Sequence, residues 1–209
     1  MHRKPRALIL LVLALMCCGA SVSPTDRLSD EICASDKTAM LALDEQSFDQ
    51  DVANGGGGWR RIASNQECEL VAADLIAEYR QVHKINSPLL FWHEGQLRAF
   101  SGQYAQAITL LQNSYKPKEQ DFGWNAYADA TIAFLQGNRR KLEQALARLK
   151  STPAPPGENL HDGHIEMTQP DGTKFKMPWP LNVDVVQGLQ RCMGKPYRDA
   201  YSSSCRPGS

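Results

Sequence analysis

Charged side chains flank a run of four glycines at residues 55–58, and they are the first candidates for a chemical site. Asp49 and Asp51 precede the glycines, and Arg60 and Arg61 follow them. Carboxylates beside guanidinium groups could bind a small ligand, but a charged loop surface explains the same residues. The run also lacks the Lys and the Ser or Thr that a phosphate-binding P-loop needs after its last glycine. We therefore interpret it as a linker or turn.

A second candidate is the cluster of His161, Asp162 and His164, which has residue types that bind zinc or copper. A site of this kind needs a further ligand, and two histidines with one aspartate in a polar loop are more often solvated. We expect no metal and no cofactor. His83 and His93 fall on predicted helices, and the sequence offers no partner for either.

Hydrolytic motifs are not found in the sequence. There is no GxSxG elbow, no HExxH pair and no cysteine with a recognisable activating neighbour. The sequence therefore assigns no catalytic residue. This weakens an enzymatic interpretation without excluding it.

The elements that must position these residues begin after residues 1–20, which read as a cleavable export signal. Three bases precede an apolar run of about a dozen residues, which is shorter than the roughly 20 residues of a membrane-spanning helix. Small residues follow, so cleavage after Ala20 or Ser23 is expected. The mature chain is then expected to be a single domain, residues 24–209. We expect it to be exported to the periplasm.

A lipoprotein is the alternative, because Cys17 and Cys18 lie near the end of the apolar run. Lipoprotein signals place a small residue just before the acylated cysteine, and Met16 and Cys17 are poor fits. Secretion to the exterior is a second alternative.

Removing the signal leaves four cysteines and a slightly acidic chain. No basic excess suggests nucleic-acid binding, and no later stretch is apolar enough to cross a membrane. An even cysteine count in an exported chain indicates disulfides. Three pairings are possible, and we favour the local one, which joins Cys33 to Cys68 and Cys192 to Cys205.

Apolar residues recur at three- and four-residue steps through most of the chain, which predicts a mainly α-helical fold. Ser87 and Pro88 look like a helix start, and Gly102 and Gly137 look like helix ends. Two antiparallel helical hairpins are predicted at residues 87–115 and 121–150.

A C-terminal extension, residues 157–209, follows a proline-rich stretch. Turn residues around Gly172 predict a small β-hairpin, and Asn182 could cap a final helix that ends before Gly194. The tail after that helix is expected to be loose unless Cys205 is bonded to Cys192.

The hairpins resemble tetratricopeptide repeats. The segment LFWHEGQLRAFSGQYAQAITLL, residues 90–111, matches the repeat at Gly95, Gly102, Tyr104, Ala107 and Ile108. Tryptophans recur at a period typical of such units. The resemblance implies an α-α superhelix and suggests an uncharacterised exported bacterial family. Any two adjacent helical hairpins of similar length would give a comparable pattern.

The resemblance also implies a partner-binding groove along the first helix of each hairpin. Its lining would comprise Trp92, Gln96, Trp124, Tyr127 and Thr131, which share helical faces. Aromatic rings beside amides suit an extended peptide. The alternative is that both tryptophans belong to the core.

From these features we expect a non-catalytic adaptor or scaffold that binds a protein or peptide in the periplasm. Its oligomeric state is left open. One alternative is an enzyme or small-ligand-binding protein with a pocket between the helical array and the C-terminal hairpin. Another is a purely structural envelope protein.

Overall fold

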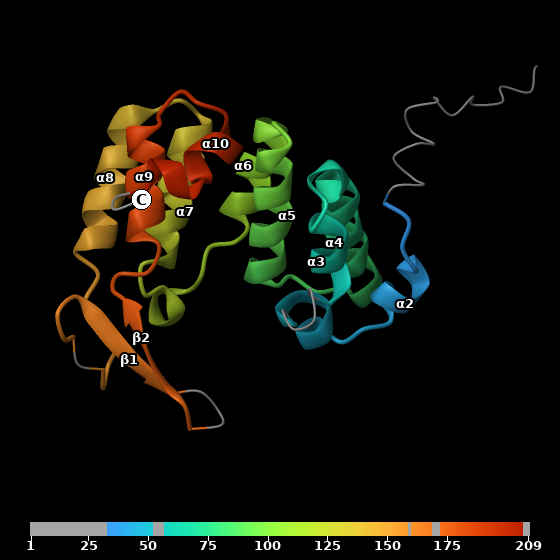
Figure 1. Cartoon of the computed structure of the whole chain (residues 1–209), viewed down its shortest axis with the longest axis horizontal. Helices are drawn as coiled ribbons and strands as arrows, with labels where there is room; N and C mark the ends of the chain where they lie inside the picture. The colour runs from blue at the N-terminus through green and yellow to red at the C-terminus, as the bar shows by residue number, and fades with distance from the viewer. Residues whose placement is uncertain (1–32, 52–56, 159, 169–171, 207–209) are drawn as a thin grey trace, which may run out of the picture.

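A computed structural model describes residues 33–51, 57–158, 160–168 and 172–206, and the expected export signal lies outside them. Helices form a row along the molecule, and one small β-hairpin extends from it (Figure 1). The first half contains α2 (Lys37–Leu41), the π-helical turn η1 (Gln46–Gln50), α3 (Gly58–Ala63), the 3-10 turn η3 (Gln66–Cys68), α4 (Glu69–His83), α5 (Pro88–Phe100) and α6 (Tyr104–Gln112).

The second half contains more helices and both strands. They are the 3-10 turn η4 (Lys118–Gln120), α7 (Trp124–Leu135), α8 (Arg139–Lys150), β1 (His164–Thr168), β2 (Lys174–Pro178), α9 (Val183–Arg191), α10 (Tyr197–Tyr201) and the 3-10 turn η5 (Ser203–Cys205). The predicted mainly helical fold with a small hairpin followed by helices is confirmed.

Local sequence signals account for several helix ends. Pro88 occupies the first turn of α5, where a backbone N–H has no partner within the helix, so the N–H that proline lacks is not needed. Gly102 and Gly137 follow α5 and α7 with φ of 78° and 67°, a left-handed conformation that glycine adopts without strain. Asn138 then caps α8 by accepting from the N–H of Lys141.

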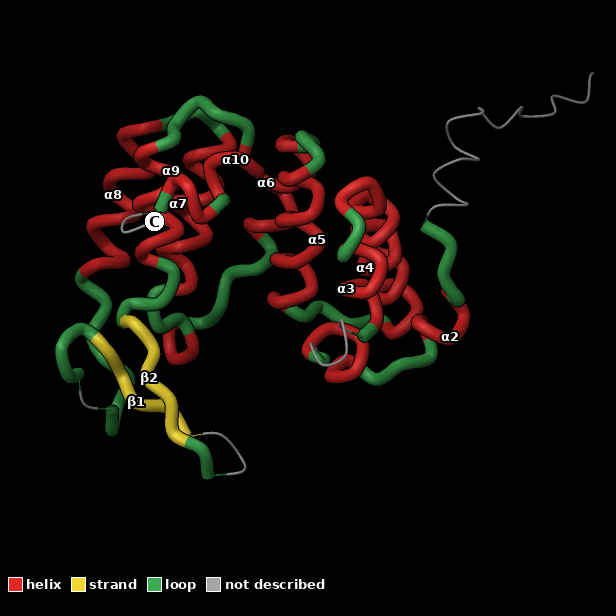
Figure 2. The backbone as a smooth tube through the Cα atoms, in the orientation of Figure 1, coloured by secondary structure: helices red, strands yellow, loops and turns green. Residues whose placement is uncertain are grey.

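Helices α5 and α6 form one antiparallel hairpin, and α7 and α8 form the next (Figure 2). Gly95 allows the close approach within the first pair, because a Cβ atom there would lie 3.1 Å from Leu111 Cγ and 3.2 Å from Leu110 Cβ. A larger residue at position 95 would push α6 away from α5.

Two apolar cores meet at α5. Leu90 and Leu97 face the first core, which α3 and α4 also line, whereas Trp92 and Ala99 face the second, which extends to α10. Because one helix contributes to both cores, the halves of the row pack as one continuous structure.

The glycine run does more than link two segments, which corrects its interpretation as a linker or turn. Residues 52–56 lie outside the described part, but α3 begins at Gly58, directly before Trp59. A Cβ atom on Gly58 would lie 2.1 Å from Phe48 O, and one on Gly57 would lie 2.5 Å from Ser47 O. These two glycines therefore let α3 pack directly against the backbone of η1.

The tail after α9 is held by a disulfide, as expected for a bond between Cys192 and Cys205. It forms α10 and η5, and Tyr197 and Ala200 are buried in the second core. The disulfide joins Cys192, directly after α9, to Cys205 in η5, and another joins Cys33 to Cys68. The favoured pairing is thus the one in the structure.

Disulfides of this kind indicate an oxidising compartment, consistent with an exported chain. Across the described residues, no helix has the length and apolar character needed to traverse a membrane.

Candidate functional site

A buried carboxylate, Asp49, lies where η1, α3 and α5 meet. Its side chain is 1% exposed. Asp49 Oδ1 accepts hydrogen bonds of 2.7 Å from Trp59 Nε1 and from His93 Nδ1, and the other oxygen accepts from Gln50 Nε2. Residues from either side of the glycine run thus converge with a histidine of α5.

These hydrogen bonds keep Asp49 ionised. Burial raises the pKa of the carboxyl, but hydrogen bonds from His93, Trp59 and Gln50, together with the charge interaction with His93, lower it by more, so the net pKa lies below the ordinary value of 3.8. A charged carboxylate cannot donate, so His93 Nδ1 is the donor in this hydrogen bond.

Arg60 completes the cluster. Its Nε donates to the backbone oxygen of Asp49 at 2.7 Å, and its Nη2 lies 3.5 Å from His93 Nε2. The guanidinium also lies 4.3 Å from the ring centroid of Trp59, and its burial lowers the pKa of Arg60. Three contacts thus fix the guanidinium plane.

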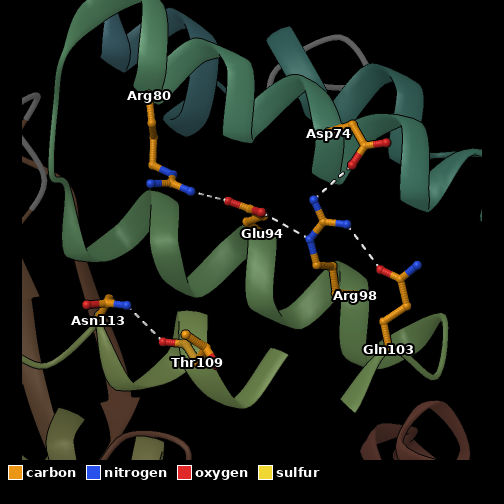
Figure 3. A network of polar contacts seen from close by, with 7 residues as sticks. All are labelled: Asp74, Arg80, Glu94, Arg98, Gln103, Thr109 and Asn113. Carbon is orange, nitrogen blue, oxygen red and sulfur yellow. Dashed lines mark hydrogen bonds and ion pairs between the residues drawn. The ribbon is translucent and has the colours of Figure 1, made fainter. Parts of the chain in front are cut away.

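A second polar network joins α4 to α5 (Figure 3). Glu94, 3% exposed, accepts from Arg80 Nη2 at 2.5 Å and from Arg98 Nε at 3.0 Å. Arg98 also donates to Asp74 at 2.8 Å and to Gln103 at 3.1 Å. Burial lowers the pKa of Arg98, but its two carboxylate partners raise it more. Among the described residues, Arg80 Nε is the one buried side-chain atom of this network without a hydrogen-bond partner, so the network mainly joins α4 to α5.

The expected groove residues lie mainly inside the second core. Trp92, Tyr127 and Thr131 are 4%, 3% and 1% exposed, and the Trp92 and Tyr127 rings lie tilted to each other with their centroids 4.6 Å apart. Trp124 and Gln96 are half-buried. Trp92 is therefore a core residue, as the alternative interpretation has it, whereas Trp124 and Gln96 keep part of their surface exposed.

Helix α10 covers part of the same region. Tyr197 lies 5.3 Å from the Phe100 ring of α5 and 5.9 Å from the Phe134 ring of α7. Figure 1 shows α10 between α5 and α9. Helix α10 therefore packs against α5 and α7 through these aromatic contacts.

The His161 and His164 pair serves the hairpin backbone. The N–H of each donates to the carbonyl of the other at 2.9 Å, and Asp162 sits in the turn with φ of 49°. Among the described residues, no group of three or more possible metal ligands comes together. A recess of about 380 Å³ adjoins this turn, and its lining comes from the loop and strands alone, not from a helix.

Strands β1 and β2 pair antiparallel, with Glu166 opposite Lys176. The hairpin extends beyond the helices, and each strand packs chiefly against the other (Figure 2). Ile165 is buried, whereas Phe175, on the same face, is 37% exposed. One face is apolar and the other carries charge.

Beyond the bridge between His161 and His164, the outer edges of this hairpin have no backbone partner among the described residues. His164 bonds outward to His161, and residues along an antiparallel strand alternate in bonding direction. The N–H and C=O of Glu166 and Thr168 on β1 therefore point outward, as do those of Lys174 and Lys176 on β2. Within the described ranges these outward groups have no backbone partner. We call the outward groups of Glu166 and Thr168 the β1 edge.

A cleft of about 730 Å³ lies at the other end of the row, between α2 and α3. The Cys33–Cys68 disulfide, Met40, Ile62 and Arg61 contribute to its walls. It is separate from Asp49 and His93, which do not line it.

Comparisons with family models, with curated proteins and with solved structures find no match for this chain. The arguments about its function therefore rest on its own residues.

Sequence reasoning singled out Asp49 and Arg60 but assigned His93 no partner. The structure brings His93 to Asp49 across 44 residues of sequence. The position of His93 beside Glu94 on an amphipathic helix does not indicate that its side chain contacts a segment so far away in the sequence. The β1 edge was missed because edge pairing depends on register, which the sequence does not specify.

Proposed function

We propose that this chain is an exported, non-catalytic adaptor that binds a protein or peptide partner in the periplasm. The supporting observation is the β1 edge, where the outward N–H and C=O groups of Glu166 and Thr168 are positioned to pair with an extended segment. A partner strand added there would gain main-chain hydrogen bonds, a common mode of peptide recognition. The tetratricopeptide-like relationship remains part of this proposal.

The two edges of the hairpin are unlike each other. On β2 the outward positions are both lysines, and the strand ends at Pro178, which has no N–H to donate. Lysine and proline are residues that discourage strand addition. The β1 edge carries Glu166 and Thr168, which are neither lysine nor proline, and it continues the outer side on which His161 already pairs with His164.

The recess beside β1 offers a means of selection. Its walls combine Glu158, Glu166, Lys176 and two histidines, so both charges are represented. Successive side chains of an added strand would lie alternately on the two faces of the hairpin, so every second one would lie on the same face as the recess. A polar side chain in the recess suits this lining better than an apolar one.

The test compares proline and alanine at one position. Glu166→Pro removes the outward N–H but leaves the bonds to β2 intact, whereas Glu166→Ala retains that N–H. The exposed ion pair between Glu166 and Lys174 is lost in both variants and contributes little. Affinity capture from periplasmic extract should enrich the same partner with the wild type and with Glu166→Ala, but not with Glu166→Pro.

A matched control addresses the opposite edge. Lys176→Pro blocks only the outward N–H of β2 and should capture the partner normally. Circular dichroism must show that all three variants are folded. Equal capture by Glu166→Pro would exclude the β1 edge, and no enrichment by the wild type at saturating protein would count against an adaptor.

The enzymatic alternative has one observation in its favour, the histidine oriented by a buried carboxylate. Such a pairing is used to orient catalytic histidines. Here His93 Nε2 faces Arg60 rather than a hydroxyl or thiol, and this arrangement favours binding over catalysis.

A further inference from the structure

Arg60 is a half-buried guanidinium whose position is fixed from one side only. Its Nε and Nη2 contact Asp49 O and His93 Nε2 along one edge of the planar group. The end of the group, formed by Nη1 and the second hydrogen of Nη2, is not used by these contacts. An arginine held in this way presents a two-pronged donor with its orientation already set.

The charges around Arg60 leave that end available. Within the described part of the chain no salt bridge involves Arg60, although Arg80 and Arg98 both pair directly with carboxylates. Asp49, the carboxylate whose charge acts on Arg60, has both oxygens occupied by His93, Trp59 and Gln50. Its charge attracts Arg60 without blocking the open end.

The open end is also on the solvent side. Among the described residues Arg60 Nη1 has no hydrogen-bond partner, and it is not one of the buried side-chain atoms left unpaired. Arg80 Nε, by contrast, is buried and has no hydrogen-bond partner. The Glu94 network is therefore closed to solvent at that atom, whereas the end of Arg60 is not.

We propose that the Arg60 guanidinium is a binding site for an oxyanion, either a carboxylate or a phosphate group, which accepts from Nη1 and Nη2 together. Asp49, His93 and Trp59 act as positioning residues. Asp49 accepts from His93 Nδ1 and so orients the imidazole ring, His93 Nε2 lies 3.5 Å from Arg60 Nη2, and the indole lies against the guanidinium face. The site lies at the opposite end of the row from the β1 edge, so it does not depend on the proposed adaptor function.

The site can be tested by NMR on the oxidised mature protein. Inorganic phosphate and acetate, titrated separately, represent the two sources of oxyanion. The indole N–H of Trp59 reports on the cluster, because it bonds to Asp49 beside Arg60. At least one anion should give a saturable shift, and the one that does so identifies the preferred group.

Neighbouring arginines provide the matched control. Arg60→Lys keeps the charge but loses the two-pronged geometry, so binding should weaken at least about tenfold. Arg61→Lys makes the same change one residue away and should leave affinity within about twofold. Equal weakening by both variants, full affinity in Arg60→Lys, or no saturable shift with either anion would overturn the proposal.

The positioning role of His93 has its own readout. His93→Gln retains a side-chain carbonyl that can accept from Arg60, whereas His93→Leu has no acceptor. The glutamine variant should therefore bind the anion more tightly than the leucine variant, with both proteins shown to be folded by the dispersion of their spectra. If a variant does not fold, the Arg60 and Arg61 pair alone decides the site. Equal affinities of two folded His93 variants would refute positioning.

Discussion

Arg98 contacts one buried and one exposed carboxylate, so the contributions of the two ion pairs to the free energy of unfolding can be compared. Its partner Glu94 has a side chain 4% exposed, whereas its partner Asp74 is 71% exposed. The perturbations are Glu94→Gln and Asp74→Asn, which remove charge with almost no change in shape. Figure 3 shows both partners around the same guanidinium.

The expected magnitudes differ because burial differs. Removing one partner of a buried ion pair costs about 3–5 kcal/mol, since the remaining charge is left uncompensated. Glu94 is bonded to Arg80 as well as Arg98, and their side chains are only 15% and 13% exposed. An exposed pair contributes about 0–1 kcal/mol. We expect Glu94→Gln to lower the free energy of unfolding by at least about 3 kcal/mol and Asp74→Asn by less than about 1 kcal/mol.

Urea unfolding followed by circular dichroism measures both changes, provided that the m-value is unchanged. Raising the salt concentration should reduce the small effect of Asp74→Asn and leave that of Glu94→Gln nearly intact, because buried charges are screened less. Similar losses in the two variants would refute the assignment of Glu94 as the buried anchor between α4 and α5.

Two further predictions concern stability. The lowered pKa of Asp49 contributes stability above the ordinary value of 3.8 that is lost as pH falls through the folded pKa. The stability difference between wild type and Asp49→Asn, measured by urea unfolding, should therefore shrink below about pH 4; a difference independent of pH would contradict this. Cys205→Ser opens a loop whose ends are 13 residues apart and should cost about 3 kcal/mol at 25 °C on the loop-entropy model, and an unchanged urea midpoint would disprove it.

Periodicity located the two helical hairpins because their signals are local. Pro88, Gly102 and Gly137 each act within a few residues, so the ends of α5 and α7 follow from sequence alone. Helix α7 begins at Trp124, and Asp121, three residues earlier, accepts from the N–H of Asn125 in its first turn.

Long-range packing was not predictable in the same way. Helix α10 has only five residues and no strong periodicity, and its place is set by Phe100 and Phe134, which lie far back in the chain. The same packing decides that Trp92 and Tyr127 are buried rather than exposed along a groove. A helical face can be recognised from spacing, but what covers that face cannot.

The candidate site was predictable in part. Charge on both sides of the glycine run drew attention to Asp49 and Arg60, yet the run itself was taken as a linker. The need for Gly57 and Gly58 arises from contact with backbone atoms of Ser47 and Phe48, a close approach that no residue pattern specifies.

The ion pair between Glu69 and Arg198 links the start of α4 to α10 across 129 residues of sequence. Glu69 is 5% exposed, and Arg198 pairs with its buried carboxylate. The start of α4 is thus fixed in part by a side chain from near the carboxyl end of the described chain. Truncation before Arg198 should therefore destabilise the first turn of α4 as well as the second core, although α4 itself packs in the first core.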